Sequence, residues 1–234
     1  MIDICYHLFY VNDAVERFKK TIQKIYESGL YDATDSINVN LTGENSAELY
    51  NNFPVRDPKI ILTNHNENSK GETDTLKLLW DKSNQGSSRV LYLHSKGVTK
   101  PHCKKIQAWV DYMEYFLIEN WKTCLDKLES FDTCGVNLCK YMEVTHYSGN
   151  FWWANSSYIQ RLKRFDWGCA SEKARSLSTS HGMRGENHYA EFWLLDNDFC
   201  NPCNLFSLPN NPNSKTRQFC FYEIQRNSYR RLPA

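Results

Sequence analysis

The chain has 234 residues, of which 41% are hydrophobic and 14% aromatic, and no linker-like stretch divides it. This composition supports one sizeable core, so we expect a single domain over residues 1–234. The 28 Lys and Arg residues nearly balance the 27 Asp and Glu residues, which excludes an overall field of the kind that attracts nucleic acid or an anionic membrane. We therefore expect no nucleic-acid partner and, at most, a local anion site.

The first hundred residues alternate between strand and helix patterns. Residues that suit a pleated surface predict four strands, at 2–10, 36–41, 59–64 and 89–94. Apolar residues at helical spacing predict helices at 14–28, which Gly29 ends, and at 73–80. Because neighbouring parallel strands need crossover connections, this alternation predicts a Rossmann-like, mainly parallel sheet with helices on both faces.

The pattern changes after residue 100. It predicts a long helix at 106–128, short helices at 157–162 and 189–197, and strands at 134–142 and 219–224. An aromatic segment at 146–155 and a polar loop at 168–188 lie between these elements. The predicted fold class is therefore α/β, with a mixed C-terminal half.

The sequence also bears on the cellular compartment. No apolar run approaches the roughly 20 residues that span a bilayer, and the N-terminal residues lack a basic segment followed by a cleavage site. We therefore expect no membrane span and a cytoplasmic location. The nine cysteines are scattered through strand-like and helix-like segments. This odd number fits reduced, mostly buried thiols better than a disulfide framework.

Four residues at the end of the fourth strand could bind a ligand through their side chains or backbone: His94, Ser95, Lys96 and Gly97. In open parallel sheets, ligands bind outside the carboxyl ends of the strands. Lys96 offers a point positive charge for a phosphate, His94 and Ser95 offer donors, and Gly97 lets the backbone approach closely. The alternative is a surface turn with a solvated lysine.

Adjacent tryptophans stand in the aromatic segment, at Trp152 and Trp153. Successive side chains of a strand point to opposite faces, so we expect one of the two rings to line a cleft, where it can stack on a sugar or a base. The alternative is that both rings pack between layers of the fold.

Glu191 precedes Phe192 and Trp193. An aromatic neighbour partly desolvates a carboxylate, which raises its pKa and suits it to general base work on a hydroxyl. The alternative is a solvated glutamate on a helix. Cys200 and Cys203 have the spacing of half a zinc site, but no second ligand pair accompanies them, so we expect no zinc.

Four motifs carry a family resemblance: Asn68-Ser-Lys-Gly71-Glu72-Thr-Asp74-Thr-Leu, His94-Ser95-Lys96 with Trp109 downstream, Ser148-Gly-Asn-Phe-Trp-Trp-Ala, and Ala190-Glu-Phe-Trp. Together they resemble nucleotide-sugar glycosyltransferases of the GT-A fold. The closest resemblance is to the rhamnan-synthesis type of polysaccharide transferases and related proteins of bacteria and of large DNA viruses of algae and protists. The resemblance spans residues 2 to about 195.

The resemblance implies a nucleotide-sugar-binding half, residues 1–100, and an acceptor-binding half, residues 101–234. It implies transfer to a hydroxyl of a glycan or glycoprotein, with Glu191 as the base of an inverting displacement. The implied donor-binding residues are Phe9, Tyr10, Val11, Gly71, Glu72, Asp74, His94, Ser95, Lys96 and Gly97. The implied acceptor-binding loop consists of Gly149, Asn150, Phe151, Trp152 and Trp153.

One departure from the family pattern concerns the metal. Most GT-A enzymes carry an Asp-x-Asp motif for a divalent cation where this chain has His94-Ser95-Lys96. A nucleoside diphosphate leaving group develops negative charge that a cation must stabilise. The candidate substitutes are Lys96, His94, Arg226, Arg230 and Arg231. Binding of Mn²⁺ or Mg²⁺ with Asp74 and Asp81 is the alternative.

Two other functions fit parts of the sequence. A non-catalytic carbohydrate-binding module would use Trp152 and Trp153 as a stacking platform, and it would bind glycans without a nucleotide. A Rossmann-like enzyme of another kind, such as a methyltransferase, would place a Gly-x-Gly turn after its first strand. The sequence has no such turn there.

Overall fold

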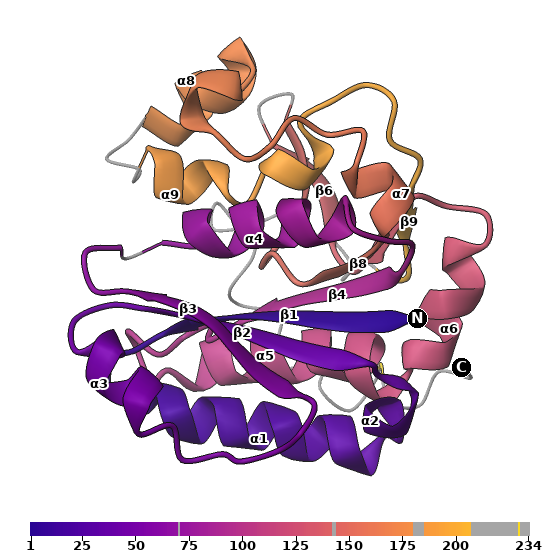
Figure 1. Ribbon diagram of the computed structural model, residues 1–234. Helices are drawn as coiled ribbons and strands as arrows, with labels where there is room; N and C mark the ends of the chain where they lie inside the picture. Colours follow the sequence, from indigo (N-terminus) through magenta and orange to yellow (C-terminus); the bar gives the residue numbers. More distant parts are fainter. Residues whose placement is uncertain (70, 142–143, 180–184, 207–228, 230–234) are drawn as a thin grey trace.

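A computed structural model of the protein describes residues 1–69, 71–141, 144–179, 185–206 and 229. Its centre is a seven-stranded sheet in the order β3-β2-β1-β4-β8-β5-β9 (Figure 1). The strands of this sheet are β1 (Ile2–Phe9), β2 (Ser36–Thr42), β3 (Ile60–Asn66), β4 (Arg89–His94), β5 (Thr133–Gly135), β8 (Trp152–Asn155) and β9 (Pro202–Asn204). A separate hairpin consists of β6 (Leu138–Tyr141) and β7 (Val144–Tyr147).

The pairing of the strands makes the sheet mainly parallel. β1 is parallel to β2 and β4, β2 is parallel to β3, and β5 is parallel to β9. Only β8, among the described strands of this sheet, runs antiparallel to its two neighbours, β4 and β5. The predicted α/β class with a mainly parallel, Rossmann-like sheet is therefore confirmed.

Helices cover both faces of the sheet (Figure 1). On one face lie α1 (Ala14–Glu27), α2 (Leu30–Ala33), α3 (Ser46–Asn51), α5 (Lys104–Glu114), the π-helix η1 (Tyr115–Glu119) and α6 (Trp121–Leu128). On the other lie α4 (Thr73–Ser83), α7 (Ser156–Ile159), the 3₁₀ turn η2 (Trp167–Cys169), α8 (Glu172–Thr179), α9 (Glu186–Tyr189) and the 3₁₀ turn η4 (Trp193–Leu195).

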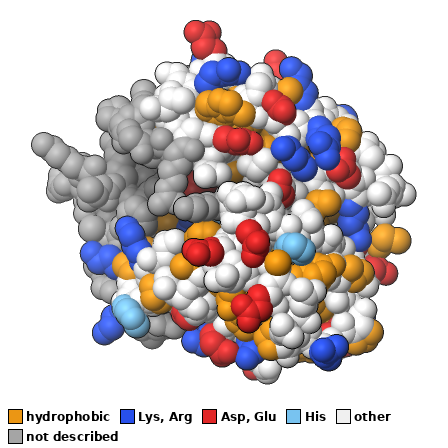
Figure 2. Space-filling view, turned by 60° about the vertical axis from the view of Figure 1, so that its left-hand side comes forward, with side chains coloured by type: hydrophobic (Ala, Val, Ile, Leu, Met, Phe, Trp, Pro, Cys, Tyr) orange, Lys and Arg blue, Asp and Glu red, His pale blue; other side chains and the backbone are white. Residues whose placement is uncertain are grey.

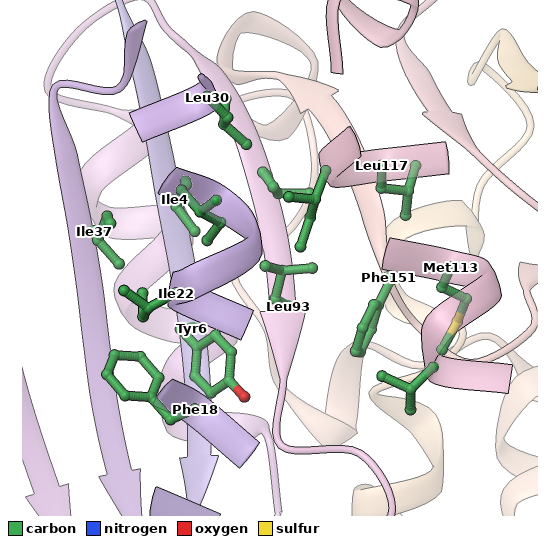
Figure 3. Packing of buried hydrophobic residues seen from close by; sticks show 14 of the residues in the cluster. Ile4, Tyr6, Phe18, Ile22, Leu30, Ile37, Leu93, Met113, Leu117 and Phe151 are labelled. Carbon is green, nitrogen blue, oxygen red and sulfur yellow. The ribbon is translucent and has the colours of Figure 1, made fainter. Parts of the chain in front are cut away.

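Both faces of β1 are covered by buried residues. Ile4 and Tyr6 of β1 pack on Phe18 and Ile22 of α1 (Figure 3), and the Tyr6 and Phe18 rings meet edge to face at 4.9 Å. The alternate residue Cys5 is buried in the cluster on the opposite face. Each buried side chain of this size contributes about 1.5–3 kcal/mol. A strand with both faces covered is rich in apolar residues, as residues 2–9 are apart from Asp3 and His7.

Two sequence expectations for the second half need correction, and a third is not tested. The predicted strand 134–142 is two strands, because Asn137, with φ 51°, turns the chain between β5 and β6. Residues 168–188 are not simply a loop, since Ala174 and Leu177 are buried one helical turn apart and hold α8 against the second core cluster. The predicted strand 219–224 lies outside the described residues.

The structure also bears on two expectations about the chain as a whole, which concern its cysteines and membrane-spanning helices. The eight cysteines of the described part are free thiols, as the scattered spacing predicts. None of the helices in the described part combines the length and the apolar character that crossing a membrane requires.

Candidate functional site

The turn after β4 is fixed at the carboxyl edge of the sheet. The Ser95 hydroxyl accepts a hydrogen bond from the Phe9 backbone N–H at 2.9 Å, and the Ser95 N–H donates to the His7 carbonyl at 2.9 Å. These bonds tie the turn to the end of β1. Gly97 has φ +87°, and a Cβ there would lie 2.6 Å from a methyl group of Ile106. Ser95 and Gly97 therefore shape the turn that presents Lys96.

Lys96 is a half-buried cation at this edge. Its Nζ lies 4.1 Å from the centroid of the Trp109 ring, a cation–π contact. Among the described residues, no carboxylate forms an ion pair with it. The ammonium is therefore held in place by an aromatic face and has no carboxylate partner among the described residues.

His94 is not a second cation. Burial, and then the nearby Lys96 charge, lower the pKa of His94 to about 3, so the imidazole is neutral at neutral pH. Its Nε2 lies 3.0 Å from the Gly149 carbonyl oxygen. Because a carbonyl can only accept, Nε2 carries the hydrogen and Nδ1 is an acceptor. The suggestion that His94 supplies positive charge to a diphosphate is therefore wrong.

Glu72 links the start of α4 to the middle of the sheet. Its Oε2 accepts hydrogen bonds from the Tyr92 hydroxyl and from Asn150 Nδ2, both at 2.6 Å. Burial is the main cause that raises the pKa of Glu72, and the Glu191 charge raises it further. Asn150 Oδ1 also accepts from Trp152 Nε1 at 2.9 Å. Glu72 and Asn150 thus hold four segments together beneath the site.

Glu191 lies in the turn after α9, within electrostatic reach of this network. Its charge raises the pKa values of Glu72, His94 and His146. Over the part of the chain that the structure describes, its carboxylate has no hydrogen-bond or ion-pair partner. Glu191 therefore acts electrostatically on the same two residues as Lys96 does, namely Glu72 and His94, with its carboxylate uncommitted among the described residues.

Trp152 and Trp153 do not line a cleft. They are 1% and 0% exposed, because β8 is inserted between β4 and β5 and both of its faces are covered. Trp152 stacks on Tyr92 at 4.9 Å in one core cluster, whereas Trp153 lies in the other and donates from Nε1 to the Leu117 carbonyl at 2.9 Å. The expectation that one ring offers a stacking surface is therefore wrong.

The rest of the implied acceptor loop is also enclosed. Asn150 and Phe151 are buried. Gly149 has φ +100°, and a Cβ there would lie 2.5 Å from Met113 Sδ and 3.0 Å from the Trp109 ring. These contacts make Gly149–Trp153 a buried wall of the site, and they explain why a glycine stands at 149.

The remaining predicted donor residues lie along the same edge. Phe9, Tyr10 and Val11 are half-buried after β1. Gly71 is buried against α9, and a Cβ there would lie 1.8 Å from Asn187 Oδ1. Asp74 Oδ2 accepts a hydrogen bond from Asn66 Nδ2 at 2.7 Å. Donor binding by these residues stays a prediction.

A buried polar chain lies under the site, and sequence reasoning missed it. Asn40 Nδ2 donates to the Thr75 hydroxyl at 2.8 Å, and Thr75 Oγ1 lies 2.9 Å from His7 Nδ1. The Thr75 hydroxyl therefore bridges the Asn40 amide, from which it accepts, and the His7 ring. Polar residues at alternating positions of β1 and β2 were the available signal.

The protein is expected to lose stability in acid through His7. Burial lowers its pKa from 6.5 to about 4, against the opposing effect of the Glu72 charge. The unfolded chain therefore takes up this proton first. The stabilisation, about 3 kcal/mol, is complete above pH 6.5 and is lost as the pH falls toward 4. Urea unfolding at pH 7 and pH 5 of both the parent and His7→Gln measures it as the difference between the two proteins, because buried His94 adds its own loss to both. His7→Gln should make the pH dependence less steep. An unchanged dependence in His7→Gln would contradict the assignment.

The described residues form no preassembled metal centre of three or more ligands at this edge. No group of three or more His, Cys, Asp or Glu side chains among them is arranged to hold a metal ion. Asp81 is engaged by Arg164, which donates to its two oxygens at 2.8 and 2.6 Å. Asp81 is therefore engaged in an ion pair, and metal binding with Asp74 and Asp81 stays a prediction. The arginines suggested as cationic substitutes, Arg226, Arg230 and Arg231, lie outside the described residues.

Comparisons with known proteins concern the whole chain. None of the curated protein sequences matches it. Among solved structures, the crystal structure of 4-diphosphocytidyl-2C-methyl-D-erythritol synthase from Anaerococcus prevotii is similar, with 12% sequence identity, 99% of each chain covered and a TM-score of 0.43. The family model described as a domain of unknown function, DUF8361, matches residues 6–224. Because this match spans most of the sequence, the chain belongs to the DUF8361 family.

Proposed function

We propose that the protein is a glycosyltransferase of the GT-A type, which moves a sugar from a nucleoside diphosphate sugar to an acceptor hydroxyl. One observation carries the proposal. An uncommitted carboxylate, Glu191, and an uncommitted ammonium, Lys96, lie near the same histidine, whose pKa one raises and the other lowers. Inverting glycosyl transfer uses a base for the acceptor hydroxyl and positive charge for the leaving diphosphate, and open parallel sheets bind their ligands at the carboxyl edge.

The two charges divide the chemistry between them. Glu191 takes the proton of the acceptor hydroxyl, and the freed oxygen forms a bond to the anomeric carbon of the donor sugar. The bond between that carbon and the diphosphate oxygen breaks, and the electron pair stays on the diphosphate. Lys96 stabilises this charge as it develops. Attack from the face opposite the leaving group inverts the anomeric configuration.

The nucleotide would lie between the end of β1 and the turn after β4. Phe9, Tyr10 and Val11 offer half-buried apolar and aromatic surface for the nucleoside, and Lys96 offers its ammonium to the diphosphate. The rival function, a carbohydrate-binding module, loses its basis because both tryptophans are enclosed in the core.

Nucleotide binding is the first test. Thermal unfolding of the purified protein is measured with UDP, GDP, dTDP and CMP, each with Mn²⁺ or with EDTA. A nucleotide at about 100 times its Kd stabilises the folded state by about 2.7 kcal/mol. We expect one nucleoside diphosphate to raise the Tm selectively, in EDTA as well as in Mn²⁺. If none of the four raises it under either condition, the proposed function is wrong.

Lys96→Met is expected to weaken binding of that nucleotide by about 10- to 100-fold, because a hydrogen bond to a charged group contributes about 1.5–3 kcal/mol. Isothermal titration calorimetry measures the change in Kd. Lys105→Met is the matched control, since Lys105 is an exposed lysine at the start of α5. Equal Kd values for the Lys96 and Lys105 variants would remove Lys96 from the diphosphate site.

A further inference from the structure

A polar groove adjoins the candidate site on the side of β3. It has a volume of about 470 Å³ and is formed where the end of β3, the start of α4 and the start of α9 meet. Its principal lining residues are Asn66, Asn68, Asp74, Lys77, Glu186 and Asn187. Figure 2 brings forward the side of the molecule to which the carboxyl ends of β1 to β4 run, and acidic and other polar side chains gather near the middle of that view.

Specific contacts join the walls of the groove. Gly71, just before α4, is packed so closely on Asn187 that no larger residue fits without displacing the amide. The Thr73 hydroxyl donates to Glu186 Oε1 at 3.3 Å, and Asn66 Nδ2 donates to Asp74 Oδ2 at 2.7 Å. The groove therefore has a defined shape, although its residues are more than a hundred positions apart in the sequence.

The lining chemistry selects one class of ligand. The amides and the Lys77 ammonium donate hydrogen bonds, whereas Asp74 and Glu186 accept them, so the groove matches groups that do both, as hydroxyls do. The negative charges of Asp74 and Glu186 would repel a phosphate. None of the described lining residues is aromatic, so the groove offers no stacking surface of the kind that a nucleobase uses. A neutral, polyhydroxylated ring fits best.

We propose that this groove binds the acceptor sugar. The proposal rests on the proposed glycosyl transfer, and it replaces the enclosed Gly149–Trp153 loop as the acceptor site. Both walls of the groove continue along the chain into the candidate site: Thr73 follows Glu72 directly, and Asn187 precedes Glu191 by four residues. A sugar that extends from the groove toward these segments would bring a hydroxyl to Glu191.

Side-chain amide signals in a ¹H–¹⁵N NMR spectrum test the site directly. The signals of Asn66, Asn68 and Asn187 are followed while the methyl glycosides of glucose, galactose, mannose and xylose are each added to about 50 mM, a range that reveals millimolar Kd values. We expect at least one glycoside to shift these signals and to leave the exposed amide of Asn52 unchanged. Absence of any such shift would overturn the proposal.

Matched variants separate binding from folding. Asn187→Ala is expected to weaken binding of the active glycoside at least tenfold, whereas Asn52→Ala leaves it unchanged. Both side chains are exposed, so both variants should fold, which their Tm values check. An unchanged affinity in Asn187→Ala would also overturn the site.

Two further arms identify the source of the sugar. If the amides respond to the nucleotide sugar that raises the Tm and not to methyl glycosides, the groove holds the donor sugar and the acceptor proposal is wrong. If they respond to free nucleosides, the ligand class is wrong. If methyl glycosides bind and no nucleotide raises the Tm, the sugar site stands and the transferase function fails.

Discussion

Glu191→Gln is expected to lower sugar transfer by about 10²- to 10⁴-fold, the usual contribution of a positioned general base. The amide is nearly isosteric with the carboxylate but cannot take a proton. Because Glu191 has no hydrogen-bond or ion-pair partner among the described residues, the substitution breaks no such contact of the fold there. Nucleotide affinity should therefore stay within about twofold of the parent value, since a base acts on the acceptor hydroxyl.

Two measurements make this test specific. Single-turnover transfer from the nucleotide sugar gives the rate, and calorimetry gives the nucleotide Kd. Glu172→Gln is the matched control, because Glu172 is an exposed glutamate in the first turn of α8. Full transfer activity in Glu191→Gln would show that another group accepts the proton, and equal losses in the two variants would point to a general charge effect.

Trp153→Ala is expected to destabilise the protein by about 3–5 kcal/mol, the usual cost of truncating a fully buried aromatic side chain. Trp153 is fully enclosed, and its indole N–H donates to the Leu117 carbonyl within the π-helix η1. Trp153→Phe keeps most of the ring but leaves that carbonyl without this donor, so a smaller loss of about 1–3 kcal/mol should follow. Urea unfolding at pH 7 measures both values.

This experiment also decides between the two roles of the tryptophans. A core residue changes stability and leaves ligand affinity nearly constant in the molecules that remain folded. A surface platform does the reverse, so a loss under 1 kcal/mol together with lost glycoside binding would contradict the burial of Trp153. Phe199→Ala is a suitable control, because Phe199 is a large aromatic residue that is 43% exposed.

The strands of the first half and the helices α1 and α4 are readable from the sequence, whereas the short helices α2 and α3 were not predicted. Residues 2–10, 36–41, 59–64 and 89–94 each match a strand of the sheet within one or two positions. Their β-rich runs are separated by amphipathic stretches long enough to cross over the sheet, so local pattern and global topology agree. For the same reason, the placement of Lys96 at the carboxyl edge follows from its position after the fourth strand.

The sequence by itself therefore determined the α/β class, the parallel order of the first strands and the residues at their ends, because these depend on local periodicity. Only the tertiary structure decided the fate of Trp152 and Trp153, since the covering of both faces of β8 depends on its insertion between β4 and β5. It also decided that His94 is neutral, because burial outweighs what residue type alone suggests. The groove between α4 and α9 could not be predicted from the sequence either, because its walls meet only when distant segments pack together.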